Sequence, residues 1–283
     1  MHSVTSNTLR VPGATLYYET RGSGPALLMI SGGPTDADIF APVADALADR
    51  YTVVTYDARG NSRSALDGAG QDQTVELEAE DAHRLLVAVA SEPAFIFGSS
   101  GGALVGLELV CRYPDQVETL VAHEPPLTEL LPEREQFRAY AQDVRATYLR
   151  DGVGAGMMKF VGGAGLHKNA EDAAAQTPPP DREAMARMGR NAEHFLAHRF
   201  LPFSRYTPDF AAFRAAPAKV VVAAGESSVG QPAQRCSVAL ADQLHTPLAQ
   251  FPGDHGGFLS DPRGFADYLD RLFSGAQISG GAR

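Results

Sequence analysis

The sequence predicts an α/β fold in which a mostly parallel sheet carries helices on both faces and an inserted block of helices interrupts the pattern. Short, continuously apolar runs alternate with helical patterns in both halves of the chain, which is typical of parallel strands covered on both faces. Between residues 127 and 206 no convincing strand occurs, although helical patterns continue. These two observations together indicate one large domain with an insertion.

The N-terminal part alternates strands with helices. Residues 37–50 place Ile39, Phe40, Val43 and Leu47 at helical spacing, and residues 75–90 begin with acidic side chains that suit the positive end of a helix dipole. Apolar runs that end in Gly or Pro predict the strands between these helices. The expected strands span residues 14–22, 26–31, 51–60, 94–98 and 117–126, and the expected helices span 37–50, 75–90 and 101–114.

The block at residues 128–206 is too long for a connecting loop. Its expected helices, at 134–149 and 181–200, are separated by a glycine-rich piece and a proline-rich linker. We interpret the block as a cap over the carboxyl edge of the sheet, where such sheets bind ligands; the alternative is that it pads one face. Residues 1–127 and 207–283 then form the core, with strands at 218–225 and 247–253, helices at 231–245 and 262–273, and a frayed tail.

Composition excludes several classes of function. The net charge of −10 disfavours nucleic acid and anionic membranes as partners, because both require a positive surface. Cys111 and Cys236 form no CxxC or Cys/His cluster, so we expect free thiols in a reducing compartment and no metal site. No signal peptide or membrane-length apolar run is evident. We therefore expect a cytoplasmic protein, monomeric or homodimeric, that acts on a small molecule without a cofactor.

The stretch Gly98-Ser99-Ser100-Gly101-Gly102 matches Gly-x-Ser-x-Gly between an expected strand and an expected helix. This motif turns a strand sharply into a helix and leaves one serine at the apex, and its glycines let the two elements approach. Ser100 occupies the apex and is the candidate nucleophile, whereas Ser99 is its neighbour in the turn. The alternative is a Gly/Ser turn without chemistry.

Five segments in order give the chain a resemblance to a known family. They are SGGP at 31–34, YDARGNSRS at 56–64, GSSGG at 98–102, AHEPP at 122–126 and PGDHGGF at 252–258. Over nearly its whole length the chain resembles the α/β-hydrolase fold superfamily, of the capped type with a serine nucleophile. The resemblance implies an eight-stranded sheet and the catalytic order nucleophile, acid, histidine. It also implies that His255, in the glycine-rich loop before the last helix, is the general base.

The catalytic acid departs from the common family pattern. Many members carry an aspartate after the seventh strand, where this chain has Ser228 in GESSVGQP. Some members, including haloalkane dehalogenases, place the acid after the sixth strand, which corresponds here to Glu124. We favour Glu124, with Glu226 and Asp254 as alternatives. The acid would hold His255 in the correct tautomer and stabilise its protonated form.

The resemblance also assigns an oxyanion hole and a pocket. The main-chain amides of Gly33 and Gly101 would be its donors, although Ser31 replaces the usual histidine of the first loop. Asp57 and Arg59 are expected to brace loops, and Arg63 to contact the cap or the substrate. We expect apolar side chains of the cap to line the substrate pocket. The alternative is that they only pack inside the cap. The candidates are Met157, Phe160, Phe195 and Phe203.

We therefore expect a serine hydrolase that cleaves a carboxylic ester, or a related acyl bond, through an acyl-enzyme. A serine at the elbow argues against dehalogenase or epoxide hydrolase chemistry, which uses an aspartate there. One alternative is a non-hydrolytic enzyme on the same scaffold, such as a lyase, a cofactor-free oxygenase or a cyclase, in which His255 acts on the substrate directly. Another is a ligand-binding protein without catalysis.

Overall fold

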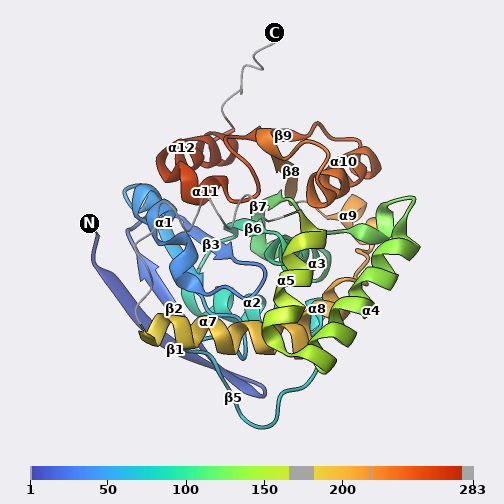
Figure 1. Cartoon of the computed structure of the whole chain (residues 1–283). Helices are drawn as coiled ribbons and strands as arrows, with labels where there is room; N and C mark the ends of the chain where they lie inside the picture. Colours follow the sequence, from blue (N-terminus) through green and yellow to red (C-terminus); the bar gives the residue numbers. More distant parts are fainter. Residues whose placement is uncertain (1, 166–181, 217, 276–283) are drawn as a thin grey trace.

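The computed structural model describes residues 2–165, 182–216 and 218–275. Its centre is a nine-stranded sheet in the order β1-β2-β4-β3-β6-β7-β8-β9, with the two-residue β5 beside β2 (Figure 1). The strands from β4 to β9 along this path run parallel, whereas β2 pairs antiparallel with β1, β4 and β5. This confirms the predicted α/β fold class; the sheet has the expected eight strands along its main path and β5 as a ninth. The strands are β1 Val4–Val11, β2 Ala14–Arg21, β3 Ala26–Ile30, β4 Thr52–Tyr56, β5 Ala65–Leu66, β6 Ala94–Ser99, β7 Val117–His123, β8 Lys219–Gly225 and β9 Ala249–Phe251.

Helices cover both faces of the sheet, which explains why its central strands are continuously apolar. In β3, Leu28 and Ile30 belong to the hydrophobic core on one face, and Leu27 and Met29 to the core on the other. Helices α2, α3 and α10 pack on the first face, and α1, α11 and α12 on the second. Their bounds are α1 Ala41–Leu47, α2 Val75–Val89, α3 Gly101–Arg112, α10 Pro232–Leu244, α11 Gly257–Ser260 and α12 Pro262–Phe273, with short helices η1 Ala37–Phe40, η2 Pro114–Gln116 and η5 Glu226–Ser228.

The described residues between β7 and β8 contain helices and no strand. We call residues 128–165 and 182–206 the helical insertion. Figure 1 shows α4 and α5 together in yellow-green at the right and α7 in gold across the lower part of the molecule. Residues 166–181, which include all of the expected proline-rich linker, lie outside the described residues. The elements are η3 Thr128–Leu130, α4 Arg134–Asp151, α5 Val153–Ala164, α7 Arg182–His194, the π-helical turn η4 Phe195–Arg199 and α8 Phe200–Phe203, followed outside the insertion by α9 Phe210–Ala215.

Helix α5 occupies the glycine-rich piece, for which we expected no regular element. Its glycines lie where side chains of α4 approach. A Cβ at Gly156 would lie 2.9 Å from the Cβ of Tyr148, and one at Gly163 would lie 2.3 Å from the ring of Tyr140. Packing against α4 therefore overrides the low helix propensity of glycine.

Strand β1 was also not predicted from the sequence. Six of its eight residues are exposed, so no alternation of apolar and polar side chains marks it. It is held by antiparallel pairing with β2 along its whole length and by Val11, which packs with Leu16. The tail beyond residue 275, which we expected to be frayed, lies outside the described residues.

Cys111 is half-buried and Cys236 is buried, and both are free thiols. Within the described ranges, no cluster of three or more His, Cys, Asp or Glu side chains is arranged to hold a metal ion. No helix in those ranges combines the length and the apolar character that crossing a membrane requires.

Candidate active site

Ser100 is the single residue between strand β6 and helix α3. Strand β6 ends at Ser99 and α3 begins at Gly101, and the backbone of Ser100 has φ 55° and ψ −124°. Such a conformation is unfavourable for serine and persists only where neighbours fix it. Here the Ser100 amide donates to the carbonyl of His123 at 2.9 Å, and a Cβ at Gly102 would lie 2.0 Å from the carbonyl oxygen of Ile30. The close approach of α3 to β3 therefore demands glycine at that position.

The two adjacent serines have different surroundings. Ser100 lines an open pocket beside the helical insertion. Ser99 is buried, and its hydroxyl lies 3.4 Å from Nδ1 of His123. Ser100 is therefore the serine that a bound molecule can reach.

The buried Glu124 and the partly buried His255 form a pair at the same edge of the sheet. Oε2 of Glu124 lies 2.5 Å from Nδ1 of His255, and Oε1 accepts a hydrogen bond from the amide of Gly225 at 3.0 Å. Glu124 is fully buried. Burial alone would raise the pKa of this carboxyl group. The hydrogen bond and charge of His255 outweigh burial and lower the pKa to about 2. The carboxylate is therefore ionised at neutral pH and able to orient the imidazole.

Among the candidate acids, only Glu124 is shown hydrogen-bonded to His255 in the described residues. Glu226 is exposed, and Asp254 accepts a hydrogen bond from the amide of Gly256 at 2.8 Å. Ser228 is fully buried beside Glu124. Its hydroxyl lies close enough to help lower the pKa of Glu124, although its Oγ makes no hydrogen bond of good geometry.

Ser100, His255, Gly33 and Gly101 line one pocket of about 850 Å³, a volume that includes its open mouth. The opposite wall comes mainly from the helical insertion and is largely apolar. Phe160, Phe195 and Phe203 belong to this wall, as expected. The remaining lining residues are Pro126, Thr128, Phe137, Tyr140, Ala141, Gly163, Ala164, Arg199, Phe200, Ser204, Pro232 and Ala233.

Met157, in contrast, is not among the lining residues. It packs within the helical insertion, against the cluster that contains Val144 and Leu196. We expected Met157 in the lining as an apolar side chain of the cap, but α5 turns it toward α4 and η4 rather than toward Ser100.

The loop after β3 packs directly on the elbow. A Cβ at Gly32 would lie 2.6 Å from the amide nitrogen of Gly101 and 2.7 Å from Cβ of Ser100, so only glycine fits. The carbonyl of Gly32 accepts a hydrogen bond from Oγ1 of Thr35 at 2.6 Å. In a trans peptide this carbonyl and the Gly33 N–H point in opposite directions. Thr35 therefore fixes the peptide that carries the first expected oxyanion donor.

Two residues of the site were not identified from the sequence. His123 precedes Glu124 and is fully buried among the rings of Phe97, Phe251 and Phe265. Burial lowers the pKa of His123 to about 4, so its ring is neutral at pH 7. Its adjacency to Glu124 in AHEPP was the available signal. The second is Arg199, a buried arginine in the pocket wall, which gave no signal within a helical pattern rich in Arg and His.

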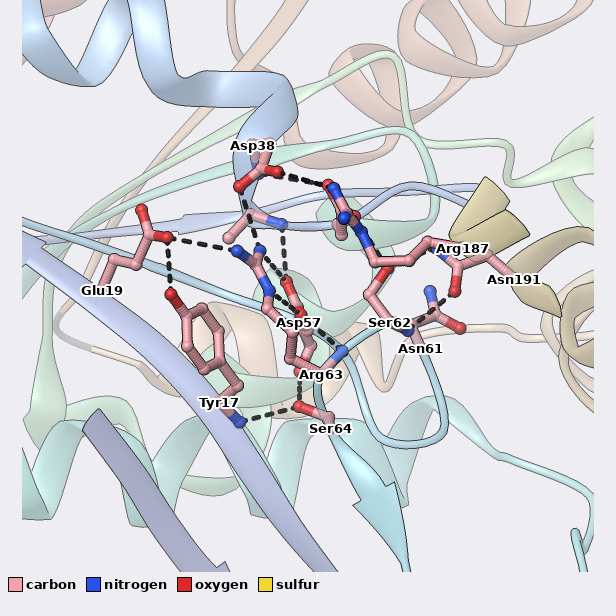
Figure 2. Close-up of polar contacts among 12 residues, drawn as sticks. Tyr17, Glu19, Asp38, Asp57, Asn61, Ser62, Arg63, Ser64, Arg187 and Asn191 are labelled. Carbon is pink, nitrogen blue, oxygen red and sulfur yellow. Dashed lines mark hydrogen bonds and ion pairs between the residues drawn. The ribbon is translucent and has the colours of Figure 1, made fainter. Parts of the chain in front are cut away.

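A polar network beside the pocket braces the loops that follow β3 and β4 (Figure 2). Its centre is Asp57, which is fully buried and accepts hydrogen bonds from the amide of Ala37 at 2.9 Å and from the side chain of Arg63 at 2.7 and 2.9 Å. Arg63 also stacks over the ring of Tyr17 at 4.0 Å. It therefore lies in this network and not in the wall of the pocket. Arg59 forms a separate bidentate pair with Asp81.

The same network joins the helical insertion to the core. Asn191 of α7 accepts a hydrogen bond from the amide of Ser62 at 2.7 Å and donates to its hydroxyl at 2.9 Å. Arg187, one turn earlier on α7, pairs with Asp38 at 3.4 Å. Figure 2 shows α7 approaching the Ser62 loop through these side chains. The position of α7 against the core is thus set by polar contacts at Ser62 and Asp38.

Comparison with known proteins agrees with this architecture. A family model described as the alpha/beta hydrolase fold matches residues 25–178. The chain is 37% identical over 273 residues to the uncharacterized hydrolase YraK of Bacillus subtilis, which covers 94% of this chain and 95% of the relative.

Solved structures show the same fold. A thermophilic esterase from Thermogutta terrifontis superposes with a TM-score of 0.72 at 19% identity, covering 97% of this chain and 98% of the esterase. A hydrolase from Pseudomonas aeruginosa superposes with a TM-score of 0.71 at 22% identity, covering 96% and 98% of the two chains. With the family match and the long relative, these likenesses lead to one conclusion: the chain belongs to the alpha/beta hydrolase fold family and is a hydrolase.

Proposed function

We propose that this hydrolase cleaves a carboxylic ester through a covalent acyl-enzyme on Ser100. The observation that carries the proposal is the short contact between the buried Glu124 carboxylate and His255, in a pocket that Ser100 also lines. A serine hydroxyl becomes an effective nucleophile only when a base accepts its proton. Nδ1 of His255 donates to Glu124, so Nε2 is the nitrogen left to act as that base.

In the proposed reaction, Ser100 attacks the ester carbonyl while Nε2 of His255 takes its proton. The negative oxygen of the tetrahedral intermediate is bound by the main-chain amides of Gly33 and Gly101. His255 then protonates the leaving alcohol, and the acyl-enzyme forms. Water, activated by the same imidazole, hydrolyses it and releases the acid.

The pocket favours an uncharged, apolar acyl or alcohol group. Its wall consists mainly of aromatic and small apolar side chains, and Arg199, the buried cation among its described lining residues, is already paired with Glu78. The helical insertion supplies most of this wall and thus serves as a cap. Small or medium-sized esters with apolar groups therefore fit this site better than esters with polar or charged groups do.

Labelling with a fluorophosphonate probe, located by mass spectrometry, tests the proposal. We expect a single adduct on Ser100 and hydrolysis of p-nitrophenyl butyrate. Ser100→Ala should lose both the adduct and the activity, and the matched control Ser99→Ala should retain both. Absence of the adduct from folded wild-type protein would remove the acyl-enzyme and favour non-hydrolytic chemistry, such as that of a lyase, in which His255 acts on the substrate itself.

A further inference from the structure

We propose that Arg199 is a positioning residue: it holds the oxyanion loop through the carbonyl of Gly33 and so links the seating of the helical insertion to catalysis. The inference rests on the proposed function, because it assumes that the Gly33 amide stabilises an oxyanion. Arg199 itself touches no reacting atom. Its effect is on the geometry of the loop.

Arg199 is among the largest fully buried side chains in the described residues. It is the last residue of the π-helical turn η4, and its Nε and Nη2 contact the two carboxylate oxygens of Glu78 at 2.6 and 2.8 Å. Glu78 belongs to α2, so this pair crosses from the insertion to the core. A bidentate pair fixes the plane of the guanidinium as well as its position.

The third contact of the guanidinium reaches the oxyanion loop. Nη1 of Arg199 donates to the carbonyl oxygen of Gly33 at 2.8 Å. On the other side of the same residue, Thr35 holds the carbonyl of Gly32. The peptides before and after Gly33 are therefore each held by a side-chain donor, which leaves the Gly33 N–H little freedom to turn.

Hydrogen bonds matter at Gly33 because its Cβ position, unlike that of Gly32, contacts no neighbouring atom. Gly33 has φ 60°, and a Cβ built on it would meet no atom within 4 Å. An unpacked glycine with a left-handed backbone can adopt several other conformations. The two hydrogen bonds are thus the restraints that keep its amide in place before the substrate binds, which is the preorganisation that oxyanion stabilisation requires.

The same side chain also reaches the second donor indirectly. The guanidinium lies 4.5 Å from the ring centroid of Phe203, and this ring lies 3.5 Å from the Cβ position of Gly101. Arg199 therefore contacts Gly33 directly and supports the ring that covers Gly101. One side chain of the insertion is linked in this way to both halves of the oxyanion hole.

The test compares Glu78→Gln with the double variant Arg199→Met/Glu78→Gln. Both lack the ion pair, but only the double variant lacks the hydrogen bond to Gly33. Because a small misplacement of a catalytic group costs on the order of 10²-fold, we expect kcat for p-nitrophenyl butyrate to fall roughly 10- to 100-fold below that of Glu78→Gln, with KM little changed. Affinity for an apolar trifluoromethyl ketone, whose tetrahedral adduct carries the oxyanion, should fall by a similar factor.

The outcomes separate the two proposals. If wild-type protein neither hydrolyses the ester nor labels at Ser100, the proposed function is wrong. If wild type is active and the double variant matches Glu78→Gln in kcat and in ketone affinity, the role of Arg199 is wrong while the function stands. Should the double variant not fold, Arg199→Met/Glu78→Leu replaces the pair with apolar side chains, a change that buried ion pairs often tolerate, and the same comparison is made against Glu78→Leu.

Discussion

Nδ1 of His255 lies 2.5 Å from a carboxylate oxygen of Glu124, although the two residues are 131 positions apart in the chain. The topology of the sheet produces this contact. Strands β7 and β8 are parallel neighbours, so Glu124 at the end of β7 lies beside Gly225 at the end of β8 and donates its amide hydrogen to the carbonyl of Ala223 at 2.9 Å. The loop that carries His255 folds back over this edge.

Glu124→Gln should lower kcat by about 10³- to 10⁴-fold, the loss seen when a triad acid is neutralised. The amide preserves the shape of the side chain but cannot stabilise a protonated imidazole by charge. Steady-state hydrolysis of p-nitrophenyl butyrate measures the effect. The matched control is Glu226→Gln, an exposed glutamate in the next strand-end loop, which should stay close to wild type. An unimpaired Glu124→Gln enzyme would contradict the assignment.

Ser228→Asp should restore part of the activity lost in Glu124→Ala. Ser228 is buried beside the Glu124 carboxylate, so an aspartate there places a negative charge on the same side of His255. We expect the double variant to exceed Glu124→Ala by at least about tenfold in kcat, as a fraction of the ~10⁴-fold that a triad acid contributes. If Ser228→Asp/Glu124→Ala is no faster than Glu124→Ala, the two positions are not interchangeable.

Asp57→Ala should destabilise the protein by about 3–5 kcal/mol, because removal of one partner leaves a charged network uncompensated. Asp57 is fully buried and holds both the amide of Ala37 and the guanidinium of Arg63. Urea unfolding followed by circular dichroism measures the loss. Asp38→Ala removes a half-exposed partner of the same arginine and should cost less than about 1 kcal/mol, as exposed ion pairs do. Equal losses would show that burial of Asp57 is unimportant.

Stability should fall as the pH drops from about 6.5 to 4, because the pKa of buried His123 is about 4. Burial keeps this ring neutral in the folded protein, whereas an unfolded histidine takes up a proton below about 6.5. The unfolded state then binds more protons, and His123 lowers the free energy of unfolding by about 1.4 kcal/mol per pH unit in this range.

Glu124 adds to this effect in stronger acid. Its pKa of about 2 in the folded protein is below that of a free glutamate, so its contribution is complete above about 4.3 and is lost as the pH falls toward 2. Urea unfolding of His123→Leu should show a shallower slope between pH 6.5 and 4. His245→Asn, at an exposed helix end with φ 54°, should leave the slope unchanged. A His123→Leu slope equal to that of wild type would place the acid sensitivity elsewhere.

Phe160→Ala should shift the preference of the enzyme toward longer acyl chains. Phe160 lines the pocket, and its ring packs edge-on against Phe195 and Phe200, so truncation opens space in the apolar wall. The ratio of kcat/KM for p-nitrophenyl octanoate to that for the acetate should rise about 10-fold, the effect of a few methylene groups in an apolar pocket. Met157→Ala is the control from the same helix, and an equal change in both variants would contradict the described lining.

The local parts of the site could be predicted from the sequence, because short-range geometry determines them. Gly98 to Gly102 specify a strand, a sharp turn and a helix, and the glycine-rich loop before the last helix pointed to His255 through its likeness to the histidine loop of the family. Glu124 required the resemblance to a family, since no local pattern shows that the ends of β7 and β8 meet. Its place beside His255 is a property of strand order, which residue spacing does not contain.

The parts that could not be predicted depend on contacts between distant elements. Strand β1 has three apolar residues among eight and buries only Val11, so its pairing with β2 leaves little trace in the sequence pattern. The burial of Arg199 was not predicted, because the sequence pattern assumed a regular helix over residues 181–200. The π-helical turn from Phe195 to Arg199 rotates the side chains that follow it, so a regular pattern does not show which of them face the core. Helix α5 packs closely against α4 because its glycines leave room for tyrosine side chains of α4, a contact that residue spacing does not show.

The location of Glu124 has a consequence for how related chains are sorted. A search for active members that demands an aspartate after β8 would discard this chain at Ser228 and classify it as inactive. The carboxylate that contacts His255 simply comes from the neighbouring strand. Under the proposed function, an acid at the end of either strand can serve His255, so relatives with a serine after β8 should first be examined for a glutamate or aspartate after β7.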